Sequence, residues 1–259
     1  SALAAKGDVS LPTLPAADLN NDGSNDMAGV ADGRHIAIGG TQTGFHGLSV
    51  TATNSDNIGA LTISLGGGTV GVAVSAGVNV VTTTTQAYIG VGAVVNQDTS
   101  TGGGLQSVHL AAGNDFHHLA VAATLAAGVV GVSPAVEVTV LANTTMAFVD
   151  SGATVNARND MAVQAHARED LVLLGFGIAA GTVGVGGSVN VLTLNNTTVA
   201  SLAGTIFAGG DALVYATDDT SLTAVSGALG AGFVGVGGSQ GVMIVNKNTQ
   251  AFVADGTRV

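Results

Sequence analysis

The sequence has no cysteine, no tryptophan and only three prolines. The absence of cysteine excludes disulfide bonds and thiolate metal sites. Aromatic residues make up 3% of the 259 residues, whereas 40 residues are glycine. A core built on large aromatic side chains is therefore excluded, and we expect an interior of closely packed Val, Ala and Gly.

Positive charge is also scarce. Six Lys and Arg residues stand against 17 Asp and Glu residues, giving a formal net charge of −11. Basic side chains are needed to neutralise the phosphates of nucleic acids. Nucleic acid is therefore not expected as a partner, and an anionic membrane surface is disfavoured for the same reason.

Long apolar runs raise the question of a membrane helix. The mean hydropathy is +0.51, and the segment Leu61–Val81 carries no charge, so it is long enough to span a bilayer. However, glycine recurs at every second or third position, and the equivalent stretches contain Ser, Thr, Asn, Pro134 and Glu137. This composition favours packed strands over lipid-facing helices, and we expect no membrane insertion.

One stretch of the sequence occurs four times, with variations. Each copy contains a Gly/Val run and then an Asn/Thr segment, as in GTVGVAVSAGVNVVTTTTQAYI (68–89). Counted from one glycine in each copy, a Thr always follows fourteen residues later and an Ala sixteen residues later, while another Ala lies nineteen residues before. The reference glycines are Gly71, Gly131, Gly184 and Gly235, and the Thr residues are Thr85, Thr145, Thr198 and Thr249.

A repeat of fixed offsets predicts an all-β fold, specifically a parallel β-solenoid in the form of a right-handed β-helix, with about four repeats of roughly 51 residues. Each repeat is either two coils of about 25 residues or one flattened coil with two long sides; an antiparallel barrel or sandwich is the alternative. We expect an N-terminal segment at 1–44 and the solenoid at 45–259. The expected repeats are 45–104, 105–159, 160–210 and 211–259.

The chain is interpreted as a piece of a longer protein. It begins with Ser, and DGTRV (255–259) matches the middle of a turn and strand seen in earlier repeats. We therefore expect truncation at the C-terminal end. Uncapped strand edges tend to pair with further strands, which makes end-to-end self-association of copies a possible outcome.

A calcium-type loop lies in the N-terminal segment. Oxygen side chains at loop positions 1, 3, 5 and 9, a glycine at 6 and a backbone carbonyl at 7 form the arrangement that Ca²⁺ prefers. The loop resembles those of FG-GAP repeats and dockerins, although Gly29 replaces the Glu that an EF-hand has at position 12. An Asx-rich turn is the alternative. The predicted ligands are Asp18, Asn20, Asp22, Ser24 and Asp26.

Acidic segments recur in the middle of the repeats and are predicted to be elbows that face water. A hydrolase would need two carboxylates meeting on one face, whereas a solvated stripe needs no such meeting. No catalytic residue is predicted, and the chain is not expected to be an enzyme. The segments are TNSDN (53–57), GNDFHH (113–118), HARED (166–170) and TDDTS (217–221).

The Asn/Thr segments are expected to stack as polar ladders that satisfy one another along the solenoid. Two other interpretations remain open. A flat Thr array could order water and bind ice, but one position of the array changes through Thr83, Asn143, Asn196 and Lys247. A carbohydrate groove is disfavoured by the scarcity of aromatic residues.

The repeat, as in VGVGGSVNVLTLNNTTVASLAG and SVTATNSDN, resembles the passenger repeats of giant bacterial surface proteins of the filamentous-haemagglutinin and leukotoxin-like adhesin type, over residues 45–259. The resemblance implies a secreted or cell-surface β-solenoid that acts as a stalk or adhesive fibre toward a host-cell, surface or polysaccharide receptor. A polysaccharide-active β-helix enzyme (lyase or hydrolase) and an ice- or surface-binding solenoid are the alternatives.

The calcium loop generates a first prediction. Because Ca²⁺ binds only the folded loop, saturating calcium should raise the melting temperature of the chain relative to a chelator. The measurement is a thermal melt followed by circular dichroism in both conditions. Replacing Asp22 with Ala should abolish the difference; an unchanged midpoint in the unmodified chain would remove the calcium assignment.

Overall fold

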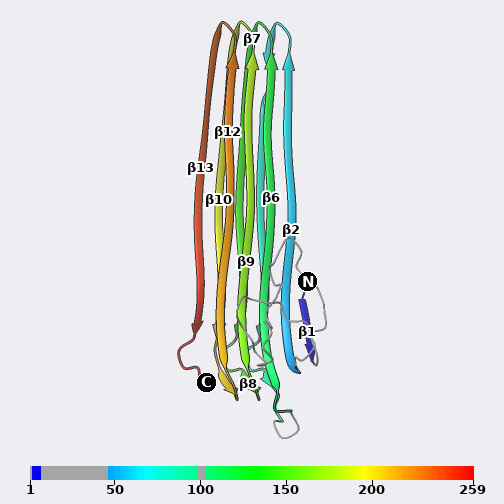
Figure 1. Cartoon of the computed structure of the whole chain (residues 1–259), viewed down its shortest axis with the longest axis vertical. Coiled ribbons are helices and arrows are strands. Elements are labelled where there is room, and N and C mark those ends of the chain that lie inside the picture. Colours follow the sequence, from blue (N-terminus) through cyan, green and yellow to red (C-terminus); the bar gives the residue numbers. More distant parts are fainter. Residues whose placement is uncertain (1, 7–45, 99–102) are drawn as a thin grey trace.

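The computed structural model describes residues 2–6, 46–98 and 103–259. All the regular secondary structure in this part of the chain consists of β-strands. The strands form three sheets, in which successive turns of the chain lie beside one another in parallel (Figure 1). The chain is therefore an all-β parallel solenoid of about four coils, as the repeat predicts.

Two of the sheets are long and face each other. The first sheet contains β2 (His46–Gly67), β6 (Gln106–Ala127), β9 (Met161–Ala180) and β12 (Ala212–Ala231). The second sheet contains β3 (Val70–Val72), β4 (Ser75–Ile89), β7 (Val130–Val149), β10 (Val183–Leu202) and β13 (Val234–Val253). The short sheet contains β5 (Val94–Val95), β8 (Thr154–Ala157) and β11 (Thr205–Ala208).

Each repeat forms one flattened coil. The chain ascends in the first sheet, turns at the end that we call the apex (residues 68–69, 128–129, 181–182 and 232–233), and descends in the second sheet. It then passes through the short sheet at the opposite end, the base, before the next coil begins. A strand of 20 residues is about 66 Å long at ~3.3 Å per residue, so the longest dimension runs along the strands (Figure 1). Of the two coil types that the repeat allowed, the flattened coil with two long sides is the one formed.

Like residues stack on like residues across the coils. The pairing of β10 with β13 runs from Val183↔Val234 to Leu202↔Val253 without a gap, and β10 pairs with β7 over its whole length in the same way. The reference glycines therefore form one column through the second sheet. This stacking explains why the offsets to Thr and Ala are constant in the sequence.

The chain leaves the second sheet through glycines that adopt left-handed backbone conformations. The φ angles of Gly92, Gly152, Gly204 and Gly256 are +70°, +77°, +89° and +77°. Residues with a Cβ atom rarely adopt such angles. The recurrence of glycine after each long strand is therefore a requirement of the turn.

The antiparallel strand β1 (Ala2–Lys6) pairs with the N-terminal part of β2. It is the one strand of the described residues that departs from parallel pairing in the long sheets. The remainder of the predicted N-terminal segment, including the calcium loop, lies outside the described residues.

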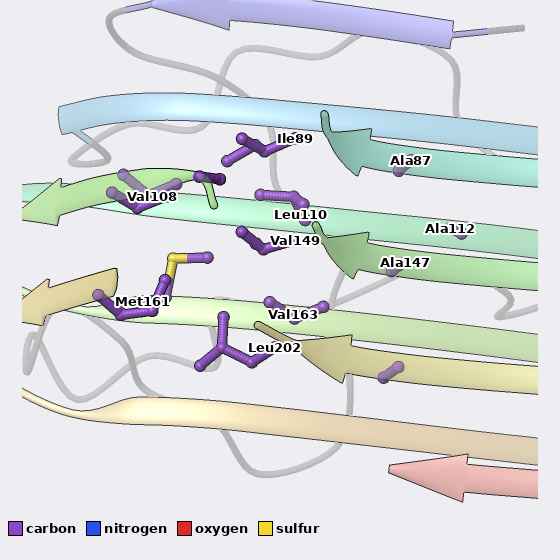
Figure 2. Close-up of a cluster of buried hydrophobic side chains, with 14 of the residues drawn as sticks. Ala87, Ile89, Val108, Leu110, Ala112, Ala147, Val149, Met161, Val163 and Leu202 are labelled. Carbon is purple, nitrogen blue, oxygen red and sulfur yellow. The ribbon is translucent and has the colours of Figure 1, made fainter. Parts of the chain in front are cut away.

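An apolar core fills the half of the molecule near the base. Leu110 and Val163 of the first sheet meet Ile89, Val149 and Leu202 of the second sheet, and all five are buried (Figure 2). Alanines of both sheets extend this cluster along the strands toward the apex, as Ala87, Ala112 and Ala147 show in Figure 2. The two conserved offsets to Ala in the repeat thus correspond to inward positions.

The predicted acidic elbows are wrong. Each acidic segment lies within a continuous strand of the first sheet: 53–57 in β2, 113–118 in β6, 166–170 in β9 and 217–221 in β12. Side chains alternate between the two faces of a strand, so half of each segment points into the interior. Glu169, for example, is 0% exposed.

The glycine column generates a second prediction. A Cβ atom on Gly184 would lie 2.7 Å from the carbonyl oxygen of Ala231 and 2.8 Å from that of Ala179. Gly184→Ala should therefore destabilise the fold by about 1–3 kcal/mol, the usual cost of overpacking. The measurement is the midpoint of urea unfolding, which should fall.

Gly187 on the same strand provides the matched control. The nearest atom to a Cβ at that position is the carbonyl oxygen of Gly238 at 3.8 Å, an ordinary contact. Gly187→Ala should leave the midpoint unchanged or raise it slightly, because alanine restricts the unfolded chain. Equal losses in the two variants would contradict the close approach at Gly184.

Candidate functional site

The predicted calcium ligands Asp18 to Asp26 lie outside the described residues, so the calcium site stays a prediction. Among residues 2–6, 46–98 and 103–259, no three His, Cys, Asp or Glu side chains are grouped so as to hold a metal ion. Within the same residues, no helix is long and apolar enough to cross a membrane.

A cluster of polar side chains lies between the two long sheets, and we call it the carboxyl cluster. It consists of Glu169 from β9, Asp218 and Thr220 from β12, Asn143 from β7 and Lys247 from β13. The two carboxyl groups come from neighbouring strands of the first sheet, and the amide and the ammonium group come from the second sheet. The cluster therefore joins three coils.

The hydrogen bonds of the cluster centre on the two carboxyl groups. Thr220 Oγ1 donates to Glu169 Oε2 at 2.9 Å, and Asn143 Nδ2 donates to Glu169 Oε1 at 3.5 Å. Lys247 Nζ lies 2.7 Å from Asp218 Oδ1 and also donates to Thr220 Oγ1 at 2.7 Å. The ammonium group thus compensates the charge of Asp218, while Glu169 has only neutral donors among these contacts.

Burial controls the protonation of Glu169. Loss of water and, second to it, the nearby negative charge of Asp218 together raise the pKa of its carboxyl group to about 8. The hydrogen bonds from Thr220 and Asn143 act against this shift but are weaker. Glu169 is therefore protonated at neutral pH, and the cluster holds one negative charge opposite one positive charge.

A second buried carboxyl group, Glu137 on β7, lies nearer the apex and is 1% exposed. Asn79 Nδ2 donates to its Oε1 at 2.5 Å, and Thr139 Oγ1 donates to the same atom at 3.3 Å. Gly77 is the register partner of Glu137, and a Cβ atom at Gly77 would collide with Glu137 Oε2. The carboxyl group occupies the space that this glycine leaves, and burial raises its pKa.

His117 and His118 are adjacent in β6 and point to opposite faces of the sheet, as neighbouring side chains of a strand do. His117 Nδ1 lies 3.2 Å from Asp170 Oδ2 on the outer face. His118 is buried between the sheets, where its Nε2 lies 3.5 Å from Thr139 Oγ1. Burial lowers the pKa of His118, so its imidazole is neutral and acts as a polar member of the interior.

The Asn/Thr segments divide between the two faces. Thr85, Thr145 and Thr198 are buried and point inward. Ladder contacts occur as expected at two positions: Thr83 Oγ1 donates to Asn143 Oδ1 at 2.8 Å, and Asn246 Nδ2 donates to Asn195 Oδ1 at 2.9 Å.

The carboxyl cluster contains groups that could act as acid and base, but a substrate cannot reach them. Two carboxyl groups converge, as an acid–base catalyst would require, but Glu169 and the Asp218 side chain are both 0% exposed. A hollow of about 380 Å³ near the base is lined by Asn156, Arg158 and Phe207, among others. No carboxylate lines it, so it does not contain the paired acids of a glycosidase.

The positions of the buried acids could have been found in the sequence. Because Ala165 is inward and strand side chains alternate, Glu169, four residues later, must also point inward. Glu137 lies six residues after Gly131, again an even offset on an inward column. An even number of residues between an acidic residue and an inward position of the same strand places the acid inside. The overall acidity of the segments made this spacing easy to overlook.

Comparison with models of known protein families found no match. Comparisons with curated protein sequences and with solved structures found none either. The fold is therefore assigned from the structure alone.

The carboxyl cluster generates a third prediction. The unfolded chain ionises Glu169 near its ordinary pKa of 4.5, whereas the folded chain retains the proton up to about pH 8. The contribution of Glu169 to the free energy of unfolding should therefore decrease as the pH rises from about 5 to 8, against the opposite contribution of buried histidines such as His109 below about pH 6.5. In Glu169→Gln, which keeps the shape of a protonated carboxyl group, this decrease should be smaller, as measured by urea unfolding at several pH values.

Asp255→Asn is the matched control, since Asp255 is exposed in the turn after β13. Its pH dependence should follow that of the unmodified chain. If Glu169→Gln shows the same slope as the unmodified chain, Glu169 is ionised in the folded state and the assignment of its proton is incorrect.

Proposed function

We propose that the chain is a structural and adhesive segment of a large secreted or cell-surface bacterial protein, in which stacked coils form a stalk or fibre. The observation that carries this proposal is the gap-free register between coils, in which 20 consecutive residues of β10 pair with 20 of β13. Each coil thus offers the next coil a strand of equal length to pair with. The resemblance of the repeat to haemagglutinin- and leukotoxin-like adhesins points in the same direction.

The rigidity expected of a stalk has a source in the pairing. Three strands of each long sheet pair with neighbours over about 20 residues, and buried contacts such as the carboxyl cluster join successive coils. Calcium at Asp18–Asp26 would stiffen the adjoining segment outside the cell and leave it loose inside. Both roles are structural and require no chemical step by the chain.

The two alternatives have less support. A polysaccharide-active enzyme needs its acids in an open groove, whereas Glu169 and Asp218 are enclosed between sheets. An ice-binding surface needs a flat outward array of Thr, whereas the invariant Thr column faces inward. The outward column next to it contains Thr84, Thr144 and Thr197 but ends in Asn248.

The proposed function generates a fourth prediction. Beads that carry the purified chain should be retained on cultured epithelial cells or on polysaccharide-coated glass under flow, several-fold more than beads that carry albumin. Soluble chain should compete for the same sites and reduce retention. The measurement is the number of beads remaining after a fixed increase of shear, in calcium and in chelator.

Retention equal to that of albumin on every surface would remove the adhesive role. The enzyme alternative has its own readout: incubation with a panel of polysaccharides should release no new reducing ends or unsaturated products beyond those released by heat-inactivated chain. Product release by the native chain alone would replace the structural proposal with the enzymatic one.

A further inference from the structure

The half of the molecule beside the apex has apolar side chains on both of its outer faces. We call it the apolar half: residues 59–81, 119–141, 172–194 and 223–245, which are aligned by the strand register. Outward positions there contain Gly, Ala, Val, Leu, Ile, Phe or Pro. The exceptions in the strands are Thr193, Thr223 and Gln240.

Large side chains in this half are exposed even in the central coils. On the first sheet, Leu125 is 45% exposed and Ile178 is 40% exposed, and both stack in one column with Leu65 and Leu229. On the second sheet, the column of Val78 continues through Val138, Val191 and Val242. These residues therefore form a continuous apolar surface on each side.

The interior of the apolar half changes along the strands: leucines such as Leu173 and Leu192 are buried on its base side, whereas the columns nearest the apex are small or polar. Inward columns near the apex contain Gly, Ala, Ser and Thr, as in Ser64, Thr124, Gly177 and Ala228. A Cβ atom on Gly177 would lie 2.5 Å from the carbonyl oxygen of Ser133 in the facing sheet. The sheets approach so closely here that large side chains fit only on the outside.

Some polar groups of this interior bond to backbone carbonyl oxygens inside the protein, whereas Ser133 Oγ and Ser188 Oγ are buried without a hydrogen-bond partner among the described residues. Ser75 Oγ donates to the carbonyl oxygen of Thr62 at 3.1 Å, and Thr124 Oγ1 donates to that of Ser133 at 3.1 Å. Asn190 Nδ2 donates to the carbonyl oxygen of Val225 at 2.9 Å. Beside the apex, small and polar side chains therefore lie inside while large apolar side chains lie on the outer faces, which are the faces that a hydrocarbon solvent would contact.

The boundary of this region is sharp. Glu137 is the one charged residue of the apolar half, and it is buried. All the other described charged residues lie on the base side, including Asp115, Arg168 and Asp219 on the outer face of the first sheet. The nine residues from Gly59 to Gly67 span about 30 Å at ~3.3 Å each, which equals the thickness of a bilayer's hydrocarbon core.

We propose that the apolar half embeds in the hydrocarbon of a lipid bilayer, while the charged half near the base remains in water. Each apolar face measures on the order of 600 Å² (about 30 Å by four strands of ~4.8 Å), at the upper end of the largest patch of an ordinary soluble monomer, about 300–600 Å². A second copy of the chain would cover one face, whereas acyl chains cover both faces to the same height.

The lipid class follows from charge. The net charge of −11 opposes approach to anionic headgroups, so a zwitterionic phosphatidylcholine bilayer is the preferred partner. The strand edges at β2 and β13 carry backbone groups that lipid cannot satisfy. Embedding therefore brings these edges together with the coils of neighbouring copies, which continue the same register.

The expectation of no membrane insertion came from comparing the apolar runs with helices. In a helix, the Ser, Thr, Asn and Glu137 of these runs would face lipid. In the strands observed, these residues alternate to the inside apart from Thr193 and Thr223, so most of the objection does not apply to this fold.

Vesicle flotation with site-specific labels tests the proposal. The chain has no cysteine, so Leu125→Cys, Val191→Cys and Thr197→Cys each accept one environment-sensitive NBD label. Thr197 is the matched control, because it also faces outward on β10 but lies in the charged half. With phosphatidylcholine vesicles, the full chain should float. The labels at 125 and 191 should shift to the blue and be quenched by brominated lipid, and the label at 197 should not.

A charge scan provides the second readout. Val191→Lys should reduce the floated fraction at least about tenfold, because a lysine in hydrocarbon is strongly unfavourable, whereas Thr197→Lys should leave it unchanged. Both substitutions are on the outer face, and circular dichroism should show the same strand content. Vesicles containing phosphatidylglycerol should capture less protein than phosphatidylcholine vesicles.

Two outcomes would overturn the proposal. A blue shift that depends on protein concentration and occurs without vesicles would assign the apolar faces to contacts between copies. Absence of flotation with all vesicles would exclude the bilayer. Neither outcome bears on bead retention on polysaccharide-coated glass, which contains no lipid, so failure of the adhesive role can be distinguished from failure of this proposal.

Discussion

Self-stacking is the constraint on which the rest of this structure depends. Because each coil pairs with the next residue by residue, every column must tolerate copies of a similar side chain at the spacing of paired strands, about 4.8 Å. Columns of Gly, Ala, Val and Thr satisfy this condition. The abundance of small and β-branched residues is therefore a result of this stacking, while large side chains such as Leu110 and Leu173 fill the interior away from the apex.

The same constraint explains how ionisable groups are tolerated in the interior. A column of like charges would repel itself, and no inward column is uniformly acidic: the column of Glu169 contains Asp56, Phe116 and Thr220 in the other coils. The column of Lys247 contains Thr83, Asn143 and Asn196. In these two columns no charged residue pairs with another charged residue in the adjacent coil, so neighbouring neutral donors or one lysine can compensate each charge. A charged residue in a column of otherwise neutral residues thus marks a place where a local electrostatic contact replaces the stacking of similar side chains.

Much of the architecture could be predicted from the sequence, because self-similarity needs no knowledge of side-chain packing. The parallel solenoid, the column of reference glycines and the turns at Gly92 and Gly152 all follow from constant spacing. The prediction of acidic elbows is wrong because the acidity of a segment does not determine which face of a strand its side chains occupy. A pattern of alternation identifies the face of Glu169, whereas composition does not. The calcium ligands Asp18 to Asp26 lie outside the described residues and remain a prediction.

Variation in coil length is confined to one rim of the slab. Both long sheets keep an offset of 60 residues between the first two coils and 53 between the next two. The offset is still 60 between β5 and β8, so the seven additional residues enter the connection between β5 and β6, at the base. The offset is 53 residues between β7 and β10 but 51 between β8 and β11. The two additional residues therefore lie in the connection between β7 and β8, which is also at the base. The apex keeps one length in all four coils, so insertions can diversify one end of the molecule while the other stays geometrically uniform.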